Sequence, residues 1–251
     1  EELRGVMYRS LARAVKGKRL LLKDLSRVKR AVGRELERAW KALHQLERLN
    51  LDVLPSHATP RGGAAAARAL LASALSEKAQ QVTGRVFLLL AVLYPDADME
   101  QISSGVQDTT AADSARRRGN AVELLDNLLE RDLKARFLPL VEELPRAERL
   151  KQVAELYPAP TAAPEVLLKE LTFDEAGWVR ACAIWCLAES ADDHEALAAS
   201  TADSNPIVRE IALVTVTQKA PARARSILAD RLNDDSPLVR RQAELLSAPP
   251  T

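Results

Sequence analysis

The sequence is poor in glycine and in the aromatic residues that favour strands. Only nine of its 251 residues are glycine, and aromatic residues make up 4%. Alanine, leucine, arginine and glutamate, all strong helix formers, fill most positions instead. The β-branched and aromatic alternation typical of strands is nowhere sustained for more than a few residues. The sequence therefore predicts an all-α protein.

Long apolar runs are also missing. The longest, Val86 to Tyr94, has nine residues, whereas a helix needs about 20 apolar residues to cross a bilayer. We expect a buried helix there. No signal peptide opens the chain, and its first residue is Glu1 rather than Met, so we expect that a further segment precedes it.

Cysteine is scarce as well. Cys182 and Cys186 lie four residues apart on one predicted helix, on a face that is already apolar. No His or further Cys lies near them in sequence, which disfavours a metal pair. Two buried free thiols fit a reducing, cytoplasmic compartment.

Motifs of enzymes are absent. The sequence contains no phosphate-binding glycine loop, no HExxH zinc motif and no GxSxG nucleophile motif. His194-Glu195 is a single His-Glu pair, and three histidines in total (His44, His57 and His194) are too few for an iron site. We expect no catalytic residue, no cofactor and no metal, and hence a protein that is not an enzyme.

Charge is distributed unevenly. Residues 1–50 hold 14 Lys and Arg against 6 Asp and Glu, whereas residues 51–251 hold 22 against 29. Two helices are predicted in this basic segment, about Glu2–Val15 and Leu20–Asn50. The second has an apolar stripe at three- and four-residue steps: Leu25, Val28, Val32, Leu36, Ala39, Leu43 and Leu46.

A basic stripe occupies the opposite face of that helix. It comprises Arg19, Lys23, Arg27, Arg30, Arg34, Arg38 and Lys41. These residues are candidates for contact with an anionic membrane surface, but a solvated helix face or contact with the acidic remainder of the chain would show the same pattern. Nucleic acid is disfavoured because no aromatic residues are interleaved for base stacking.

Two connectors divide the chain. Residues 55–63, PSHATPRGG, and residues 158–164, PAPTAAP, are rich in proline, glycine and small residues. We expect a basic amphipathic helical segment at 1–54, a linker at 55–63, a helical region at 64–157 and helical repeats at 165–251. The middle region is predicted to contain helices at Ala64–Gln81, Val82–Leu93, Met99–Val106, Asn120–Glu130, Leu133–Leu144 and Ala147–Leu156.

An internal repeat stands out after the second connector. The pattern D-x-x-[GP]-x-V-R-x-x-A occurs three times, with its arginines 29 and then 31 residues apart. Its positions are Asp174, Val179, Arg180 and Ala183; Asp203, Pro206, Val208, Arg209 and Ala212; and Asp234, Pro237, Val239, Arg240 and Ala243. We refer to this pattern as the repeat motif.

Each motif position has a physical reason. Asp caps the helix that follows, and Pro fits a first helical turn, where its missing N–H costs nothing. Val lies on the buried face, and the small Ala lets a neighbouring helix approach. The Arg reaches the Asp of its own or the adjacent repeat, so we expect inter-repeat pairing rather than binding of an acidic ligand.

The repeat motif resembles the HEAT family, specifically the short repeats found in phycobilin-lyase-like proteins. This resemblance covers residues 165–246 and implies an α-solenoid of helical pairs, preceded here by the long basic amphipathic segment. An older, degenerate copy is predicted at Arg118 and Ala121.

A second stretch resembles a family of large bacterial membrane proteins. "RVFLLLAVLYPDADM" and "RRRGNAVELLDNLLERDLKARFLPLVEELP" are similar to their HEAT region, which follows a transporter-like membrane domain and often precedes a cyclic-nucleotide-binding domain. That resemblance implies a linker module at the cytoplasmic face of the membrane.

The function expected from these features is a non-catalytic scaffold. Its partners would be a protein or the neighbouring domains of the same parent chain, and an anionic membrane surface is a further candidate. A free-standing adaptor that binds a protein on its concave face and an enzyme related to phycobilin lyases are the alternatives.

The last repeat is expected to lack its second helix. Its helix would run only to about Leu246, so that Leu238, Val239, Ala243 and Leu246 would form an uncovered apolar seam. We therefore expect the chain to be the middle piece of a longer protein.

Overall fold

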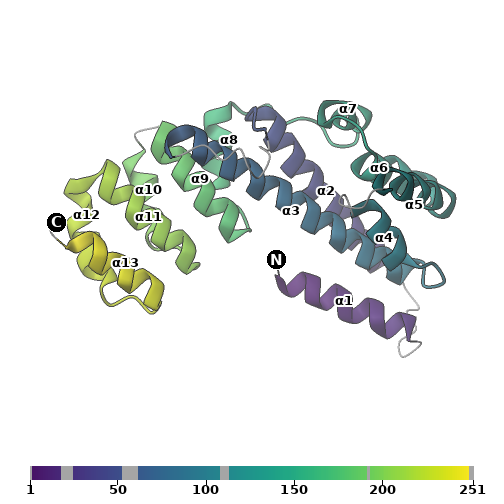
Figure 1. Cartoon of the computed structure of the whole chain (residues 1–251), viewed down its shortest axis with the longest axis horizontal. Coiled ribbons are helices and arrows are strands. Elements are labelled where there is room, and N and C mark those ends of the chain that lie inside the picture. The colour runs from purple at the N-terminus through teal and green to yellow at the C-terminus, as the bar shows by residue number, and fades with distance from the viewer. Residues whose placement is uncertain (1, 18–24, 53–61, 108–112, 191–192, 249–251) are drawn as a thin grey trace. The chain divides into compact units, whose positions relative to one another are not determined.

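The computed structural model describes residues 2–17, 25–52, 62–107, 113–190 and 193–248 (Figure 1). All regular secondary structure in these residues is helical, which confirms the prediction of an all-α protein. Among the residues described, no helix has the length and apolar character needed to span a membrane.

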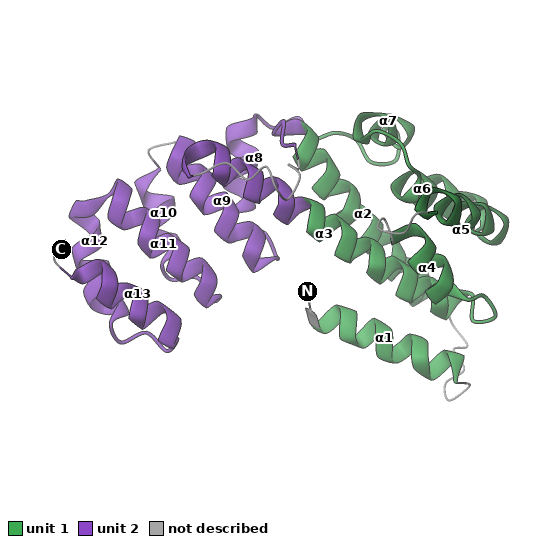
Figure 2. Cartoon of the chain, viewed as in Figure 1, with its two compact units in different colours: residues 1–47, 76–160 green, residues 48–75, 161–251 purple. Residues whose placement is uncertain are grey.

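The chain divides into two compact units (Figure 2). Unit 1 comprises residues 1–47 and 76–160, and unit 2 comprises residues 48–75 and 161–251. One boundary lies within the predicted connector at 158–164, and another lies inside a helix, between Leu75 and Ser76. Most of the predicted linker at 55–63 lies outside the described residues.

The first two helices are α1 (Glu2–Lys16) and α2 (Ser26–Arg48). The predicted start of the second helix, Leu20, lies outside the described residues. The prediction is wrong at Leu25, which is not helical. Helix α2 ends at Arg48 rather than Asn50, since Asn50 takes a left-handed conformation with φ 48° that stops a helix. The apolar stripe of α2 is buried from Val28 to Leu46, as predicted.

Helix α3 (Gly63–Leu93) is continuous. The predicted break between Gln81 and Val82 is therefore wrong, because no residue there interrupts the backbone hydrogen bonds. Gly62 and Gly63 enter the helix with φ 73° and 68°, a conformation that glycine adopts without strain. The helix stops two residues before Pro95, as expected.

The rest of unit 1 consists of α4 (Met99–Gln107), α5 (Ser114–Leu128), α6 (Arg131–Val141) and α7 (Arg146–Gln152). Helix α5 begins earlier than the predicted Asn120, because the preceding Ser-Ala-Arg-Arg-Arg run is helical despite Gly119. Helix α7 ends at Gln152, and turns replace the predicted helix up to Leu156. The predicted pair, α5 and α6, pack against each other.

The helices of the repeat region in unit 2 are α8 (Pro164–Leu171), α9 (Gly177–Ser190), α10 (His194–Ser200), α11 (Pro206–Lys219), α12 (Pro221–Arg231) and α13 (Pro237–Ser247). Each packs on the next, and α11 also packs on both α9 and α13 (Figure 1). Helices that begin within successive repeat motifs are thus neighbours: α9 packs on α11, and α11 packs on α13. Their shared core includes Ile184, Leu197, Val208, Leu213 and Val239.

Candidate functional site

The repeat arginines of unit 2 pair with the aspartate of the following repeat. Arg180 donates two parallel hydrogen bonds to Asp203, from Nε to Oδ2 at 2.8 Å and from Nη2 to Oδ1 at 2.7 Å. Its third nitrogen, Nη1, donates to the backbone carbonyl of Asp174 at 2.7 Å. The predicted inter-repeat pairing is confirmed, in the bidentate form that guanidinium and carboxylate favour.

Arg209 repeats this arrangement one step further along. Its Nε and Nη2 donate to Asp234 at 2.9 and 2.6 Å, and Nη1 donates to the carbonyl of Asp203 at 2.9 Å. Nη2 also reaches Asp235 at 2.5 Å. The Arg209 and Asp234 side chains are only 8% and 2% exposed. We call this series of pairs the Asp–Arg ladder.

The ladder controls the charge state of its carboxylates. Burial alone raises the pKa of Asp234, but hydrogen bonds from Arg209 and from the Ser236 backbone N–H outweigh it and lower that pKa to about 2. At Asp203 burial is likewise outweighed, by Arg180 and the Asn205 N–H, and the pKa is lowered. Both carboxyls are therefore ionised near neutral pH.

The motif aspartates do not cap the helices in the expected way. Oδ1 of Asp203 accepts from the backbone N–H of Asn205 at 2.7 Å, and Asp234 accepts from Ser236 in the same manner at 2.9 Å. These are turns that close before the helix starts. The cap of α11 is Asn205, whose side chain accepts from Ile207 N–H at 2.9 Å.

The ladder ends at Arg240. Its Nη1 donates to the carbonyls of Asp234 and Asp235 at 2.6 and 3.2 Å, so the guanidinium is held as in the earlier repeats. Within the part of the chain that the structure describes, no carboxylate meets its Nε or Nη2. Arg240 therefore retains half of the ladder geometry.

The Val and Ala positions of the motif form the packed side of the three helices. Val179, Val208, Val239, Ala183, Ala212 and Ala243 are each no more than 1% exposed. This overturns the expectation that Val239 and Ala243 form an uncovered seam, because both pack into the core shared with α11 and α12. Leu246 also packs against that core, which leaves Leu238 of the predicted seam exposed.

One position inside the repeat motif carries an exposed apolar side chain in all three copies. The residue before each motif Val is Trp178, Ile207 or Leu238, with exposed fractions of 47%, 41% and 42%. All three lie in the first turn of neighbouring helices, α9, α11 and α13. We call them the apolar row. The sequence pattern left this position undefined, yet each of the three residues is large and apolar.

Glycine is needed at position 177 because the Asn205 side chain approaches it closely, and not because glycine favours the start of a helix. A Cβ atom at this position would collide with Nδ2 of Asn205 and lie 2.9 Å from its Cγ. The start of α9 thus abuts the cap of α11, and only glycine leaves room for it.

The two cysteines are buried free thiols, as predicted. Burial raises the pKa of Cys182 to about 12, and burial together with the neighbouring Cys182 raises that of Cys186 to about 12. Such thiols carry little thiolate and are poor nucleophiles and ligands at neutral pH.

The predicted basic stripe of α2 is exposed at Arg27, Arg30, Arg34 and Lys41, whereas Arg19 and Lys23 lie outside the described residues. Arg38 differs from the other described residues of the stripe. It is half-buried, and its Nη1 lies 3.0 Å from Oε1 of Glu35. Arg38 therefore contributes less to an exposed basic surface than the other described residues of the stripe do.

Glu35 is the centre of a buried cluster that the sequence pattern did not indicate. Its side chain is fully buried, and Oε2 accepts from Arg85 Nε at 2.9 Å. Oε1 also accepts from the hydroxyl of Tyr8 at 3.3 Å, and burial together with Glu35 raises the pKa of that hydroxyl. The cluster ties α1, α2 and α3 together.

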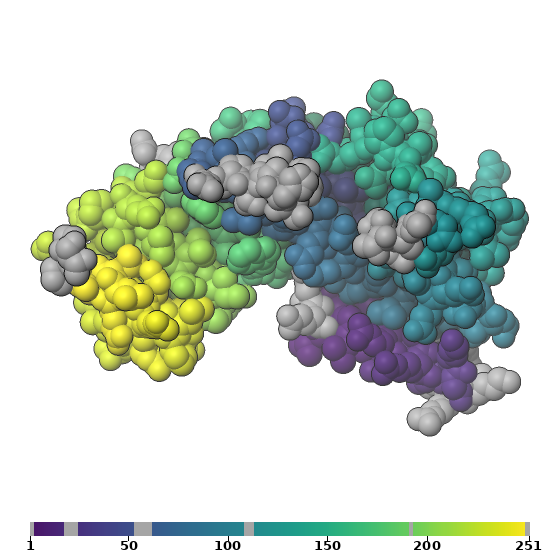
Figure 3. Space-filling view, viewed as in Figure 1, coloured from purple at the N-terminus to yellow at the C-terminus, as the bar shows by residue number. Residues whose placement is uncertain are grey.

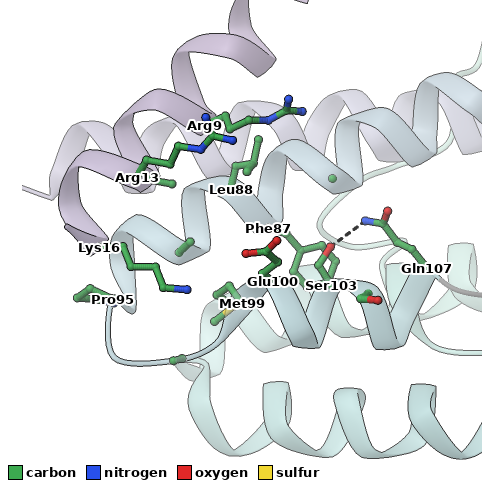
Figure 4. Close-up of a pocket in the computed structure, with 15 residues that line it drawn as sticks. Arg9, Arg13, Lys16, Phe87, Leu88, Pro95, Met99, Glu100, Ser103 and Gln107 are labelled. Carbon is green, nitrogen blue, oxygen red and sulfur yellow. Dashed lines mark hydrogen bonds between the residues drawn. The ribbon is translucent and has the colours of Figure 1, made fainter.

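A cavity of about 530 Å³ lies between α1, α3 and α4 in unit 1. Figure 4 shows Arg9, Arg13 and Lys16 reaching it from α1, opposite Phe87 and Leu88 of α3. Helix α4 contributes Met99, Glu100, Ser103 and Gln107. The cavity combines cationic, apolar and hydroxyl-bearing walls in one space.

The remaining candidates take structural places. Arg118 donates to the carbonyl of Val106 at 3.0 Å, and Ala121 is buried; Arg118 thus bonds to the carbonyl twelve residues before it, unlike the repeat arginines. His194 opens α10 beside its cap, Asp193. Across the residues that the structure describes, no three His, Cys, Asp or Glu side chains form a metal-binding group.

No protein-family model, curated protein or solved structure matches the chain.

Proposed function

We propose that the chain is a non-catalytic helical-repeat scaffold, built as a short HEAT-type solenoid, that mediates protein–protein or interdomain contacts. The observation that carries this proposal is the Asp–Arg ladder, in which the same two residue types join Arg180 to Asp203 and Arg209 to Asp234. A bond repeated between successive units is the nearest-neighbour coupling by which repeat arrays hold their shape.

The apolar row is the surface through which we propose that the scaffold binds a protein. The row consists of three large apolar side chains at one motif position, each more than 40% exposed. They lie in the first turns of the helices that the ladder links. Because the ladder fixes the spacing of these helices, it also fixes the spacing of the row. The occupant we propose is a protein segment that places apolar side chains against Trp178, Ile207 and Leu238.

Site-specific photo-crosslinking tests the row. A photoreactive phenylalanine placed at residue 178, 207 or 238 should give the same discrete protein adduct in the native host, and the same residue at the exposed position 225 should not. The adduct partner, once purified, should bind a Trp178→Ala variant about tenfold more weakly, as expected for loss of a large aromatic anchor. Identical adducts at all four positions, or none at the row, would refute the proposal.

We also propose that the module lies at the inner face of a membrane, next to a transporter-like domain, with the exposed arginines of α2 toward anionic lipid. Arg27, Arg30 and Arg34 point outward without a carboxylate partner among the described residues. Attraction of this kind acts by charge and weakens with salt.

Liposome co-sedimentation tests that placement. Binding to anionic liposomes should fall steeply with salt and be lost when Arg27, Arg30 and Arg34 are changed to Glu. A charge-matched variant with Arg223, Arg225 and Arg241 of unit 2 changed to Glu is the control and should still bind. Equal binding of the wild-type chain to neutral and anionic liposomes would exclude the membrane contact.

A further inference from the structure

The cavity of unit 1 holds unpaired positive charge. Arg9, Arg13 and Lys16 recur at four- and three-residue steps, so they share one side of α1. All three side chains are exposed, and none has a carboxylate at ion-pair distance in the described parts of the chain. Glu100 is the single carboxylate in the cavity lining. The cavity therefore has an excess of cations.

The opposite wall is apolar. Phe87 and Met99 are each 3% exposed, and Leu88 and Ala91 extend the same surface along α3. The hydroxyl of Ser103 lies at the edge of this wall (Figure 4). It accepts a hydrogen bond from Gln107 Nε2 at 3.0 Å, so its own proton can be donated to a ligand. An anionic head group and an apolar body would thus meet complementary surfaces in one space.

Helix α1 is held over this space by its own contacts in unit 1. Tyr8 bonds to the buried Glu35, and Ala12, between the basic residues, is only 8% exposed. Figure 3 shows α1, in purple, on the surface of unit 1. The cationic wall is therefore part of the folded unit and is presented in advance of any ligand.

We propose that this cavity binds a small amphipathic anion, a carboxylate, phosphate or sulfonate carried on an apolar body. Arg9 and Arg13 would hold the head group, with Lys16 as a further point charge, and Phe87, Leu88 and Met99 would contact the body. The volume of about 530 Å³ suits a small molecule. This site lies in unit 1 and is independent of the scaffold function proposed for unit 2.

Gly84 is a position from which a side chain can be built into the cavity. It lies inside α3 and lines the cavity, and a Cβ there would meet only Gln107 Nε2, at an ordinary 3.8 Å. Gly84→Leu should occupy part of the cavity while raising helix propensity. Gly119→Leu, in α5 with open space around the glycine, is the matched control.

The test uses the full chain and the fluorescent aromatic sulfonate 8-anilinonaphthalene-1-sulfonate. We expect saturable binding of one probe per chain. Affinity should fall about tenfold or more in an Arg9→Glu, Arg13→Glu double variant, because two carboxylates that repel the sulfonate replace two guanidinium groups that bind it. Gly84→Leu should weaken binding, because its side chain takes up space that the probe needs. Gly119→Leu and an Arg27→Glu, Arg30→Glu variant of equal charge change should bind as the wild-type chain does.

Competition identifies the ligand class. Laurate and dodecyl phosphate, below their micelle concentrations, should displace the probe, and their order of affinity distinguishes a carboxylate from a phosphate head. Dodecanol and inorganic phosphate should both compete poorly, since each offers half of the required chemistry. Unchanged probe binding by folded Gly84→Leu, or stronger displacement by an acidic amphipathic peptide than by laurate, would overturn the proposal. Circular dichroism of each variant verifies its fold.

Discussion

Arg209 of α11 and Asp234, which lies in the loop before α13, form a buried, bidentate pair, and Nη1 of Arg209 donates to the carbonyl of Asp203. The Arg209 side chain thus links the loop before α11 to the loop before α13. Arg180 does the same one repeat earlier, whereas Arg240 makes only the backward contact. The ladder therefore contains its own internal control.

Arg209→Ala should destabilise the chain by about 3 kcal/mol, because it leaves Asp234 buried without its main partner. Arg231 lies 3.5 Å from Asp234 and would still compensate part of its charge. We therefore expect the lower end of the range of about 3–5 kcal/mol for a broken buried pair. Arg240→Ala removes only hydrogen bonds to carbonyls and should cost about 1 kcal/mol. Urea midpoints measure both variants, and equal losses would show that the carboxylate pairing contributes nothing.

Stability should decline in acid through the ladder. A carboxyl whose pKa is lowered by folding contributes stability above its unfolded pKa and loses it as the pH falls through its folded pKa. For Asp234 that window runs from the ordinary 3.8 down to about 2, and Asp203 adds in the same direction. Unfolding free energies should therefore fall most steeply there. Asp234→Asn should flatten the slope, and a wild-type profile in that variant would contradict the assignment.

The cysteines should resist modification in the folded chain. With both thiol pKa values raised to about 12, the thiolate is about one in 10,000 at pH 8. N-ethylmaleimide should therefore label neither Cys182 nor Cys186 at native conditions, and both in urea. Mass spectrometry counts the adducts. Rapid double labelling without denaturant would show that α9 is open to solvent.

The repeat region was predictable because its signals are local. The buried Val and Ala positions and the Arg180 pairing follow from a motif that recurs three times, so that register and neighbour are both specified by spacing. The apolar row formed by Trp178, Ile207 and Leu238 was predictable only in part. The motif has no fixed residue type at this position, so the pattern does not indicate that all three residues are apolar.

Unit 1 was less predictable because its contacts join residues far apart in the chain. Glu35 pairs with Arg85, 50 residues away, and Trp40 donates to the carbonyl of Arg136, 96 residues away. No repeat indicates such partners. The spacing of Arg38 matches that of the exposed arginines, yet Arg38 pairs with the buried carboxylate of Glu35. The cavity beside α1 depends on the same long-range packing.

Gly177 and Asn205 offer the sharpest test of how successive repeats meet. A side chain at position 177 would collide with the Asn205 side chain, which cannot easily move aside because its Oδ1 caps α11 through Ile207 N–H. Gly177→Ala should therefore cost about 1–3 kcal/mol through overpacking, although alanine favours a helix. Asn205→Gly alone should cost only a few tenths of a kcal/mol, since glycine is tolerated at a helix cap.

The double variant decides between a local and an inter-repeat cause. If the collision is the reason, Asn205→Gly removes the atoms that the new methyl group at position 177 would strike, and the double variant should recover most of the stability lost by Gly177→Ala. Denaturant unfolding of the four chains gives the coupling energy directly. Additive losses would instead place the cost in the backbone of α9, and the repeats would then not meet at these two residues.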